Sequence, residues 1–416
     1  MRILFVTNNF PNPLEPTRGM FNAYTARALA RAHDVRVISQ ISWRDEAARR
    51  DVTTALPRVR MQDGIEVHHP RYYYPPGVAR QAYSWFLWQS VRSTVRRVLA
   101  GFTPDVVLGF WVHPDGDIAL RIARQAGVPG IVMAGGSDVL VLGRDEARRR
   151  CIADVLRRAD SVIGVSRHLK SAVEALGVPA ERVHVVRNGV DPSRFSPGDR
   201  LAARIRLGLD PAAPTLLWVG RMVPVKGLDI LLEAFAQSHP GAAGSALCLV
   251  GDGPLRHALA ARARALGISD RVRFAGNVSH DDLPDYYRAA DYTVLPSRSE
   301  GSPNALIEST ACGTPFIASD VGGVPDLADA GLDCLVPAED VAALADAIHD
   351  RLWRPRIRRS RSQPYTWDDH GAAMAAVFTQ AIAARRAASA RSGVTAPRGS
   401  GFERAALAPA GAPEVR

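Results

Sequence analysis

The run Glu300-Gly301-Ser302-Pro303-Asn304-Ala305-Leu306-Ile307-Glu308 carries the strongest structural signal in this chain. It follows Tyr292–Leu295, an apolar stretch typical of a buried strand, and Pro303 suits the first turn of a new helix. A helix that starts directly after a strand points its unsatisfied N–H groups, and the positive end of its dipole, at the connecting loop. The run therefore predicts a binding site for a phosphate group in this loop.

Two carboxylates flank the predicted phosphate site. Glu300 precedes the helix, and Glu308 lies about two turns further along, because an α-helix has about 3.6 residues per turn. An anion site between two carboxylates suits a ligand with phosphates in its middle and hydroxyl-rich sugars at both ends, as in a sugar nucleotide. The alternative is an ordinary surface helix with two solvated acids, and this run alone does not separate the two interpretations.

Short β-branched runs alternate with helical patterns along most of the chain, which predicts parallel sheets with helices on both faces. The alternation restarts after a linker-like segment, 188–214, that is rich in proline, glycine and charge. We therefore predict an α/β protein with two Rossmann-like, doubly wound domains that face each other across a cleft. The predicted strands are Ile3–Val6, Val35–Ile38, Val106–Leu108, Ile131–Met133, Ser161–Val165 and Val183–Val186, then Thr215–Val219, Leu247–Val250, Val272–Phe274, Tyr292–Leu295 and Pro315–Ile317.

The length of 416 residues agrees with two domains of about 150–200 residues each. We place the first domain at residues 1–195 and the second at 196–364. A helix over 365–386 is expected to return to the first domain. Residues 387–416 are small, polar and poor in core residues, so we expect a disordered tail there.

Composition excludes several classes of protein. An apolar content of 47% and a charged content of 23% are typical of a soluble globular protein. No apolar run reaches the roughly 18–20 residues of a membrane span, and no signal-peptide cleavage site follows the opening strand. The four cysteines are widely spaced, which favours free thiols in a reducing cytosol over a disulfide framework or a metal site. We expect a cytoplasmic location.

The net charge of +10 is concentrated near the C-terminus. Residues 351–361 contain six arginines and no acid, and residues 385–416 contain six arginines and two glutamates, so these segments carry +6 and +4. The rest of the sequence is close to neutral and shows no basic stripe interleaved with aromatic residues. We therefore expect no nucleic-acid partner.

One predicted helix of the first domain, Ala79–Leu99, contains no acidic residue, and Trp85 and Trp88 flank its apolar face. A basic amphipathic helix with tryptophans can bind an anionic membrane, which would place the protein at the inner face of the cell membrane. The alternative is a core-facing helix with solvated arginines. That alternative is favoured, because Rossmann-like domains need such helices in any case.

Two cations follow the first strand of the second domain. Arg221 and Lys226 lie in the segment that begins at Gly220, directly after Thr215–Val219. Ligands of open α/β sheets bind at the carboxyl ends of strands, so these side chains could bracket a diphosphate. In the first domain, Gly19 precedes the first helix and would allow close approach of a phosphate to the backbone. Solvated loop cations and an ordinary turn glycine are the alternatives.

Polar residues also follow the strands of the first domain. His113 comes directly after a buried strand and could donate to a substrate hydroxyl or carry a proton. Ser137, Asp138 and Ser166 occupy equivalent positions after the next two strands. A core or helix-capping role is the alternative for each of these residues.

Together, these residues resemble the retaining glycosyltransferases of family 4, which have the GT-B architecture. The resemblance runs from Met1 to about Arg386 and is most specific in the region from Glu300 to Asp326, which also contains the run Ala311-Cys312-Gly313-Thr314-Pro315. Gly220-Arg221 with Lys226-Gly227, and Asn188-Gly189-Val190-Asp191 at the domain junction, are also features of the family. The opening of the chain is similar to the branch typified by teichuronic acid biosynthesis glycosyltransferases.

The resemblance implies roles for the second domain. Glu300 would bind hydroxyls of the transferred sugar, and Glu308 would bind the ribose hydroxyls. Arg221 and Lys226 would hold the diphosphate and stabilise it as it leaves. Further donor-binding residues implied in the same way are Gly220, Gly301, Ser302, Pro303 and Asn304.

For the first domain, the resemblance implies that Gly19 approaches the diphosphate and that His113 contacts the donor sugar, which makes His113 the fourth expected catalytic residue. Ser137, Asp138 and Ser166 are candidates for the acceptor side. Two positions depart from the family: Gly135 stands where the family commonly has a histidine, which puts one acceptor-side contact in doubt, and Asp326 replaces the usual glutamate.

The implied reaction moves a sugar from a nucleoside-diphosphate sugar to an acceptor hydroxyl with retention at the anomeric carbon, in the synthesis of a cell-surface polysaccharide or glycolipid. The acceptor would be lipid-linked or a polysaccharide. No metal cofactor is expected, because two cations can neutralise the leaving diphosphate and no clustered Asp-x-Asp motif argues for a metal. Two alternatives stay open, a sugar-nucleotide epimerase of similar architecture and a non-catalytic subunit that binds sugar nucleotides.

Overall fold

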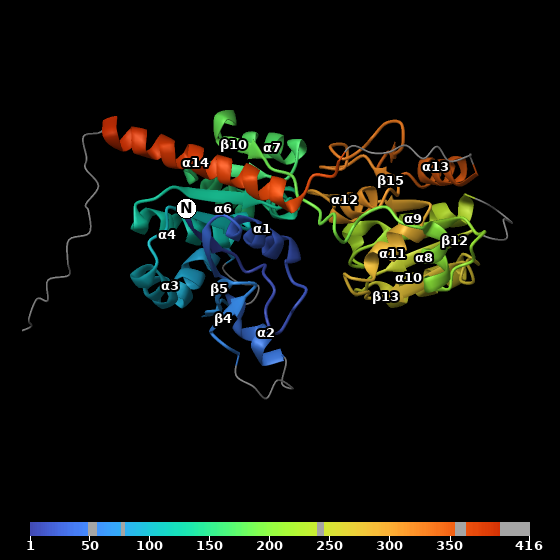
Figure 1. Cartoon of the computed structure of the whole chain (residues 1–416), viewed down its shortest axis with the longest axis horizontal. Helices are drawn as coiled ribbons and strands as arrows, with labels where there is room; N and C mark the ends of the chain where they lie inside the picture. The colour runs from blue at the N-terminus through green and yellow to red at the C-terminus, as the bar shows by residue number, and fades with distance from the viewer. Residues whose placement is uncertain (49–55, 76–79, 239–244, 354–362, 392–416) are drawn as a thin grey trace, which may run out of the picture.

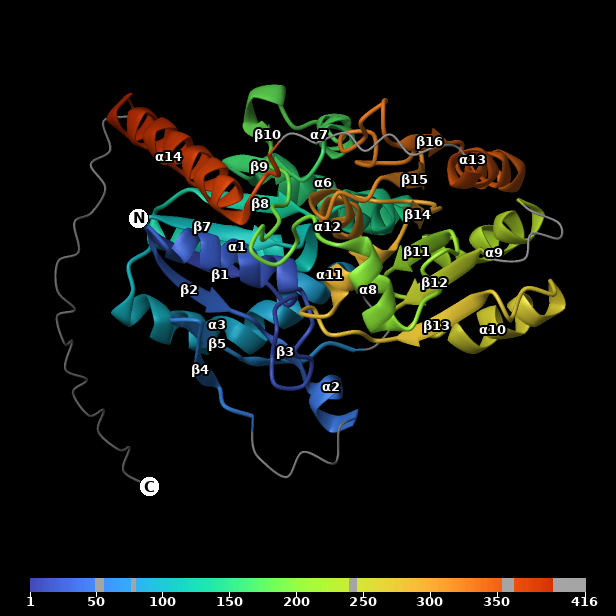
Figure 2. The same cartoon turned by 45° about the vertical axis from the view of Figure 1, so that its right-hand side comes forward.

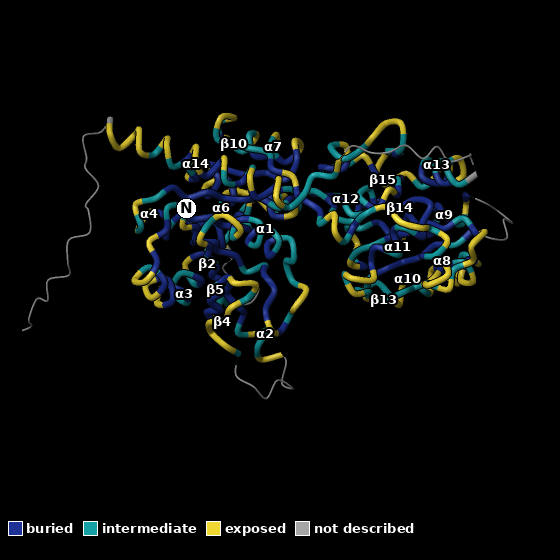
Figure 3. Tube along the Cα trace, in the orientation of Figure 1, coloured by how far each residue is buried: buried dark blue, intermediate teal, exposed yellow. Residues whose placement is uncertain are grey.

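The computed structural model of the protein describes residues 1–48, 56–75, 80–238, 245–353 and 363–391. Two large sheets lie side by side, each covered by helices (Figures 1 and 2), and their strands form the buried interior of each half (Figure 3). Strands from the first half of the chain form one sheet, and strands from the second half form the other. The predicted α/β class with two doubly wound units is confirmed.

The first sheet contains β1 (Arg2–Val6), β2 (Asp34–Ile38), β4 (Val59–Gln62), β5 (Ile65–His68), β7 (Val106–Phe110), β8 (Gly130–Ala134), β9 (Ser161–Gly164) and β10 (Val183–Val185). Its order is β10-β9-β8-β7-β1-β2-β5-β4, parallel except for the β4–β5 pair. Side chains alternate along β1, so that Ile3 and Phe5 enter the core on one face and Leu4 and Val6 enter the core on the other.

Helices of the first half cover both faces of this sheet. One core contains side chains of α1, α6 and α7, and the other contains side chains of α3 and α4. The helices are α1 (Met20–Ala30), α2 (Trp43–Ala48), α3 (Tyr83–Gly101), α4 (Asp117–Ala126), α5 (Ser137–Leu140), α6 (Glu146–Arg158) and α7 (Arg167–Glu174); β3 (Ile41–Ser42) and β6 (Arg71–Tyr72) form a small separate pair.

The strand pattern of the sequence predicts neither β4 nor β5. They form an antiparallel hairpin around Asp63 and Gly64, whose φ angles are 53° and 78°. Positive φ at both central residues is the conformation that an Asp-Gly hairpin turn favours. This dipeptide is therefore the signal in the sequence that could have located the hairpin.

The second sheet has the order β13-β12-β11-β14-β15-β16 and is parallel throughout its described pairs. The order reverses direction between β11 and β14, and this switch point is where open α/β sheets bind ligands. The strands are β11 (Thr215–Val219), β12 (Ala246–Val250), β13 (Val272–Gly276), β14 (Tyr292–Leu295), β15 (Phe316–Ser319) and β16 (Cys334–Val336). The helices are α8 (Arg200–Leu207), α9 (Leu228–Gln237), α10 (Arg256–Ala265), α11 (Leu283–Ala289), α12 (Asn304–Ala311) and α13 (Val341–Trp353).

The last described helix, α14 (Trp367–Arg391), returns to the first half of the chain and packs along α1 (Figure 1). Its first turn lies beside the outgoing linker, because Val190 accepts a backbone hydrogen bond from Trp367 and donates one to Tyr365. The helix extends past residue 386, where we expected it to end. The tail from residue 392 onward lies outside the described residues, and the domain boundary at 195/196 stays a prediction.

Helix α3 is core-facing, as the favoured interpretation of Ala79–Leu99 expects. Leu87, Val91, Val95 and Val98 are buried against the sheet, and Trp85 is 53% exposed. Among the described residues, no helix combines the length and the apolar character that a membrane span requires.

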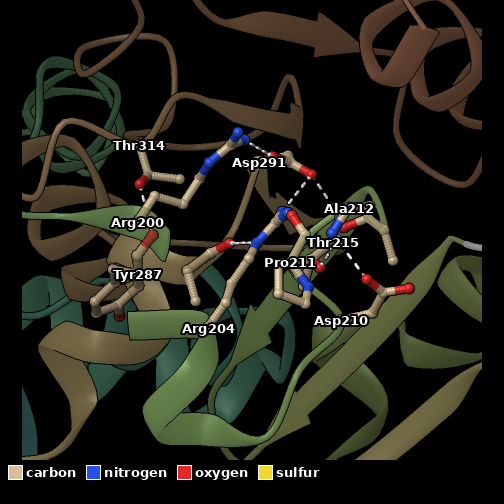
Figure 4. Close-up of polar contacts among 11 residues, drawn as sticks. Arg200, Arg204, Asp210, Pro211, Ala212, Thr215, Tyr287, Asp291 and Thr314 are labelled. Atoms are coloured by element: carbon tan, nitrogen blue, oxygen red, sulfur yellow. Dashed lines mark hydrogen bonds and ion pairs between the residues drawn. The ribbon is translucent and has the colours of Figure 1, made fainter. Parts of the chain in front are cut away.

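A buried ion pair fixes α8 against the second sheet (Figure 4). Arg204, which is 2% exposed, donates to Asp291 at 2.9 Å and to the carbonyl oxygens of Ala289 and Pro211. Burial and the charge of neighbouring Arg200 lower the pKa of Arg204 to about 10, so it stays charged at neutral pH. Arg200 donates to the other oxygen of Asp291 at 2.6 Å, so both carboxylate oxygens are held.

We expect Arg204→Ala to lower the free energy of unfolding by about 3–5 kcal/mol, because removing one partner of a buried pair leaves polar groups without compensation. Urea denaturation followed by circular dichroism measures this. Arg206→Ala is the matched control, since Arg206 pairs with Asp285 on the exposed side of the same helix and should matter far less. Equal losses in the two variants would contradict this assignment.

Candidate functional site

The loops that follow β11 and β14 meet at the switch point of the second sheet. Lys226 Nζ lies 2.6 Å from Glu300 Oε1, and the Ser297 hydroxyl donates to the same oxygen at 2.7 Å. Glu300 is 8% exposed. Two predicted catalytic residues, 74 positions apart in the sequence, therefore form one partly buried charge pair.

A glycine permits this close approach of the two loops. Gly227, with φ of 64°, precedes α9, and a Cβ atom at this position would overlap the carbonyl oxygen of Pro296. Both the left-handed backbone and the lack of space therefore require glycine here. Any larger residue would push Lys226 away from Glu300.

The helix that follows Glu300 begins at Asn304, one residue later than expected, so that Pro303 stands in the capping position. The first N–H groups of such a helix lack partners within it and suit an anion. The Asn304 side chain accepts a 2.8 Å hydrogen bond from Asn188 at the domain junction. The predicted phosphate cradle is thus tied to the linker between the two halves.

Glu308 projects from the same helix and is held from two sides. The Tyr287 hydroxyl donates to Oε2 at 2.8 Å, and His280 Nε2 lies 3.3 Å from Oε1. Burial, together with the negative charge of Glu308, raises the pKa of Tyr287 well above its usual value, so Tyr287 remains a donor. Neither partner was among the residues predicted from the sequence.

A cavity of about 1110 Å³ lies between the two halves of the molecule. The first half contributes Gly19 and His113 to its wall, and the second half contributes Gly220 and Arg221. Four predicted residues thus share one cavity, with Arg221 exposed to it. Lys226, Glu300 and Glu308 are not among the described residues that line this cavity.

His113 follows β7 and is oriented by α3, since the Ser84 hydroxyl lies 2.9 Å from its Nε2. Burial lowers the pKa of His113; the carboxylate of Asp117 opposes this shift, and the charge of Arg148 adds to it. The imidazole is therefore neutral at pH 7 and can take part in hydrogen bonds with sugar hydroxyls.

Gly19 has a φ of 60° and precedes α1. A Cβ atom there would overlap the backbone of Asn9, so only glycine fits this turn of the cavity wall.

Glycine backbones of the two halves lie in close contact. A Cβ atom on Gly301 would overlap the carbonyl oxygen of Gly135, and one on Gly136 would lie 2.5 Å from the Gly301 Cα. A Cβ atom on Gly135 itself would lie 2.8 Å from the ring of Phe110. The space where the family commonly has a histidine is thus taken by an aromatic ring.

The acceptor-side candidates are placed differently from our expectation. Asp138 is 1% exposed, and its carboxylate accepts hydrogen bonds from the N–H groups of Val112, Gly135 and Gly136. Burial raises its pKa, and these N–H groups oppose the shift. Asp138 therefore holds the loop in place and offers no free oxygen to an acceptor.

Ser166 is also occupied, because its hydroxyl accepts from the N–H of Leu169 and caps α7. The alternative of a helix cap is the correct one for this residue. Ser137, at the start of α5, is exposed and stays an acceptor-side prediction.

A larger cavity, of about 1400 Å³, lies at the C-terminal end of α12. Its wall includes Thr310, Cys312 and Arg288 but none of the predicted catalytic residues. Within the described part of the chain, no group of three His, Cys, Asp or Glu side chains could hold a metal ion.

Both halves of the chain match known protein families. Residues 19–194 match the family described as Glycosyltransferase Family 4, and residues 213–352 match the family Glycosyl transferases group 1. The D-inositol 3-phosphate glycosyltransferase of Frankia alni is 36% identical over 293 residues, which is 64% of this chain and 70% of that protein. The chain belongs to the family 4 glycosyltransferases.

Another relative of this family 4 glycosyltransferase is the teichuronic acid biosynthesis glycosyltransferase TuaC of Bacillus subtilis. It is 29% identical over 378 residues, which is 86% of this chain and 92% of that protein. The predicted family, and its likeness to the teichuronic acid branch, are confirmed.

Solved structures of similar fold support the GT-B architecture. Sucrose-phosphate synthase from Thermosynechococcus elongatus superposes with a TM-score of 0.69 at 23% identity over 94% of this chain and 98% of that one. HepE from Anabaena, solved in complex with UDP-glucose, superposes with a TM-score of 0.66 at 20% identity over 93% of this chain and 100% of that one.

The glycine contact predicts a specific defect. We expect Gly301→Ala to separate the two halves, because the added methyl group would overlap the backbone of Gly135. Small-angle X-ray scattering should show a larger radius of gyration, with far-UV circular dichroism unchanged. Gly143→Ala is the control, since a Cβ atom there meets no atom within 4 Å. An unchanged radius in Gly301→Ala would contradict the contact.

Proposed function

We propose that this glycosyltransferase moves a sugar from a nucleoside-diphosphate sugar to an acceptor hydroxyl, with retention at the anomeric carbon. The observation that carries the proposal is the Lys226–Glu300 pair beside the N-terminus of α12. This arrangement offers a cation and free N–H groups to a diphosphate, and a carboxylate to sugar hydroxyls, at the switch point of a parallel sheet. The complex of HepE with UDP-glucose supports a donor of this class.

Each donor group then has a partner. The diphosphate would lie at the N-terminal end of α12, near Gly301–Asn304, with Lys226 beside it and Arg221 reaching from the cavity wall. Glu300 would accept from hydroxyls of the transferred sugar, and Glu308, fixed by Tyr287, would accept from the ribose hydroxyls. Donor binding would compete with Glu300 for Lys226, which would release both groups to the ligand.

The chemical step breaks the bond between the anomeric carbon and the diphosphate oxygen. Negative charge builds on that oxygen, and preorganised cations and N–H groups stabilise it. The acceptor oxygen forms its bond on the same face of the sugar, and its proton passes to the leaving phosphate, as the family resemblance implies. No protein general base and no metal are required in this scheme.

The residues that the first half contributes to the cavity wall favour an anionic acceptor. Arg148 lines the cavity, and among the described residues it has no ion-pair partner, whereas Arg150 on the same helix pairs with Glu146. Tyr74 and Tyr83 stack at 4.2 Å on the cavity wall, where a sugar ring could pack. The D-inositol 3-phosphate glycosyltransferase relatives are named for a phosphorylated substrate, which agrees with such an acceptor.

We further propose a role in cell-surface polysaccharide or glycolipid synthesis, with a lipid-linked or polysaccharide acceptor at the inner face of the membrane. The name of TuaC supports the first part. Exposed Trp85 shares the outer face of α3 with the exposed arginines Arg92 and Arg96, which suits an anionic bilayer.

Lys226→Ala should lower kcat/KM. The expected loss of transition-state stabilisation is about 2–4 kcal/mol, by analogy with the loss of one preorganised donor. Nucleotide release from a panel of sugar nucleotides, with and without acceptor, measures this. Lys170→Ala, at a half-buried lysine of α7 that pairs with Glu174, should behave like the wild type. A wild-type rate of nucleotide release in Lys226→Ala would contradict the site. If the wild type releases nucleotide and free sugar without an acceptor, it is an epimerase. If the wild type releases no nucleotide at all, it is a binding subunit.

Arg148→Gln should raise the KM for a phosphorylated acceptor about tenfold or more, because a hydrogen bond to a charged group is lost. Inositol 3-phosphate and inositol are a suitable pair of probes, with the donor held at saturation. Arg149→Gln is the matched control, since Arg149 is exposed on the next position of α6. An equal KM in Arg148→Gln and Arg149→Gln would contradict an anionic acceptor site at Arg148.

A further inference from the structure

His280 lies in the loop between β13 and α11 and bridges the two halves of the molecule. Its Nδ1 is 3.3 Å from the Tyr24 hydroxyl on α1, and its Nε2 is 3.3 Å from Glu308 Oε1 on α12. The rings of Tyr24 and His280 also lie in contact, with centroids 5.9 Å apart. One imidazole therefore connects α1 to Glu308, the residue predicted to bind the ribose hydroxyls.

The hydrogen bonds of this bridge have a defined direction. Arg194 Nη1 lies 2.6 Å from His280 Nδ1, and a guanidinium can only donate. Nδ1 must therefore accept, and its single lone pair is shared between Arg194 at 2.6 Å and the more distant Tyr24 hydroxyl at 3.3 Å. The proton of a neutral imidazole then resides on Nε2, which donates to Glu308. The tautomer is assigned from these partners.

Glu308 is thereby oriented by two donors on opposite oxygens, Tyr287 on Oε2 and His280 on Oε1. A carboxylate offers about four lone-pair sites, so about two remain for ligand hydroxyls. Phe195 packs its ring edge-to-face on His280 with centroids 5.0 Å apart, which limits rotation of the imidazole. Glu308 is thus presented in one orientation.

Tyr24 brings the rest of the first half into this bridge. It lies on α1, whose first turn follows Gly19 on the cavity wall, and its ring contacts Trp367 at 5.2 Å at the start of α14. Movement of α1 relative to the second half would break the bond to His280. The orientation of Glu308 is therefore coupled to the approach of the two halves.

We propose that His280 is a positioning residue for donor recognition: it orients Glu308 toward the ribose hydroxyls, and through Tyr24 it makes this orientation depend on closure of the two halves. This inference rests on the proposed function, because it takes a nucleoside diphosphate as the ligand of Glu308. This coupling is reciprocal. If closure of the two halves increases the affinity for a nucleotide by a given factor, binding of that nucleotide favours closure by the same factor.

The test compares nucleoside diphosphates with their 2′,3′-dideoxy counterparts, using uridine, adenosine and guanosine diphosphates as probes in isothermal titration calorimetry. We expect the wild type to prefer the ribose form about tenfold or more, since hydrogen bonds to a carboxylate are lost in the dideoxy form. His280→Ala should reduce this preference to about two- to threefold by weakening binding of the ribose form only. With the cognate donor, it should raise KM more than it lowers kcat, as the loss of uniform binding does.

His280→Gln is the conservative variant, because its amide N–H can still donate to Glu308, and it should retain most of the ribose preference. His257→Ala is the matched control, since His257 is exposed on α10. A purely structural role for His280 would weaken ribose and dideoxy forms equally, and that result would overturn the inference while leaving the proposed function intact. Failure of the wild type to bind any of the diphosphates would instead overturn the proposed function.

Should His280→Ala fail to fold, Tyr24→Phe tests the coupling by itself. It removes one donor to Nδ1 and retains the ring contacts. We expect the decrease in radius of gyration that a nucleoside diphosphate causes in the wild type to become smaller in Tyr24→Phe, as small-angle scattering can measure. Tyr73→Phe, at a 51% exposed tyrosine, is its control. An identical decrease in all three proteins would contradict the role of Tyr24.

Discussion

The ion pair between Lys226 and Glu300 depends on one geometric constraint, which is that the parallel strands β11 and β14 end side by side at the point where the strand order reverses. The carboxyl ends of strands at such a reversal are where open α/β sheets bind ligands. Gly227 lets the loops approach closely enough for the two charges to meet. Strand order and one glycine therefore bring Lys226, Glu300 and the N-terminus of α12 together.

The first half of the chain faces the second half across the smaller cavity, whose described wall includes Arg221 but neither Lys226 nor Glu300. Its switch-point loops carry Gly19 and His113, and the contact of Gly135 and Gly136 with Gly301 brings the halves within backbone distance. Side chains at these glycines would hold the halves apart. The glycine at position 135, where the family commonly has a histidine, fits these contacts. Phe110 fills the space next to Gly135, and the backbone of Gly135 contacts the second half.

Much of the fold follows from local sequence, because strands buried on both faces of a parallel sheet read as continuous runs without charged or polar side chains, such as Val106–Phe110. The meeting of the charged residues of the proposed donor site was predictable from their place after strands. Their partners were not, since Ser84, His280 and Tyr287 meet His113 and Glu308 only through tertiary packing. Asp138 shows the converse, as a carboxylate after a strand looks available in sequence but folds back onto the N–H groups of Gly135 and Gly136.

The most direct test of this account is a crystal structure with the sugar nucleotide that most raises the melting temperature. The account predicts the diphosphate at the N-terminus of α12, within hydrogen-bond distance of Lys226, with Glu300 on the transferred sugar and Glu308 on the ribose. A nucleotide bound in the larger cavity at the C-terminal end of α12, with the Lys226–Glu300 pair intact, would contradict it.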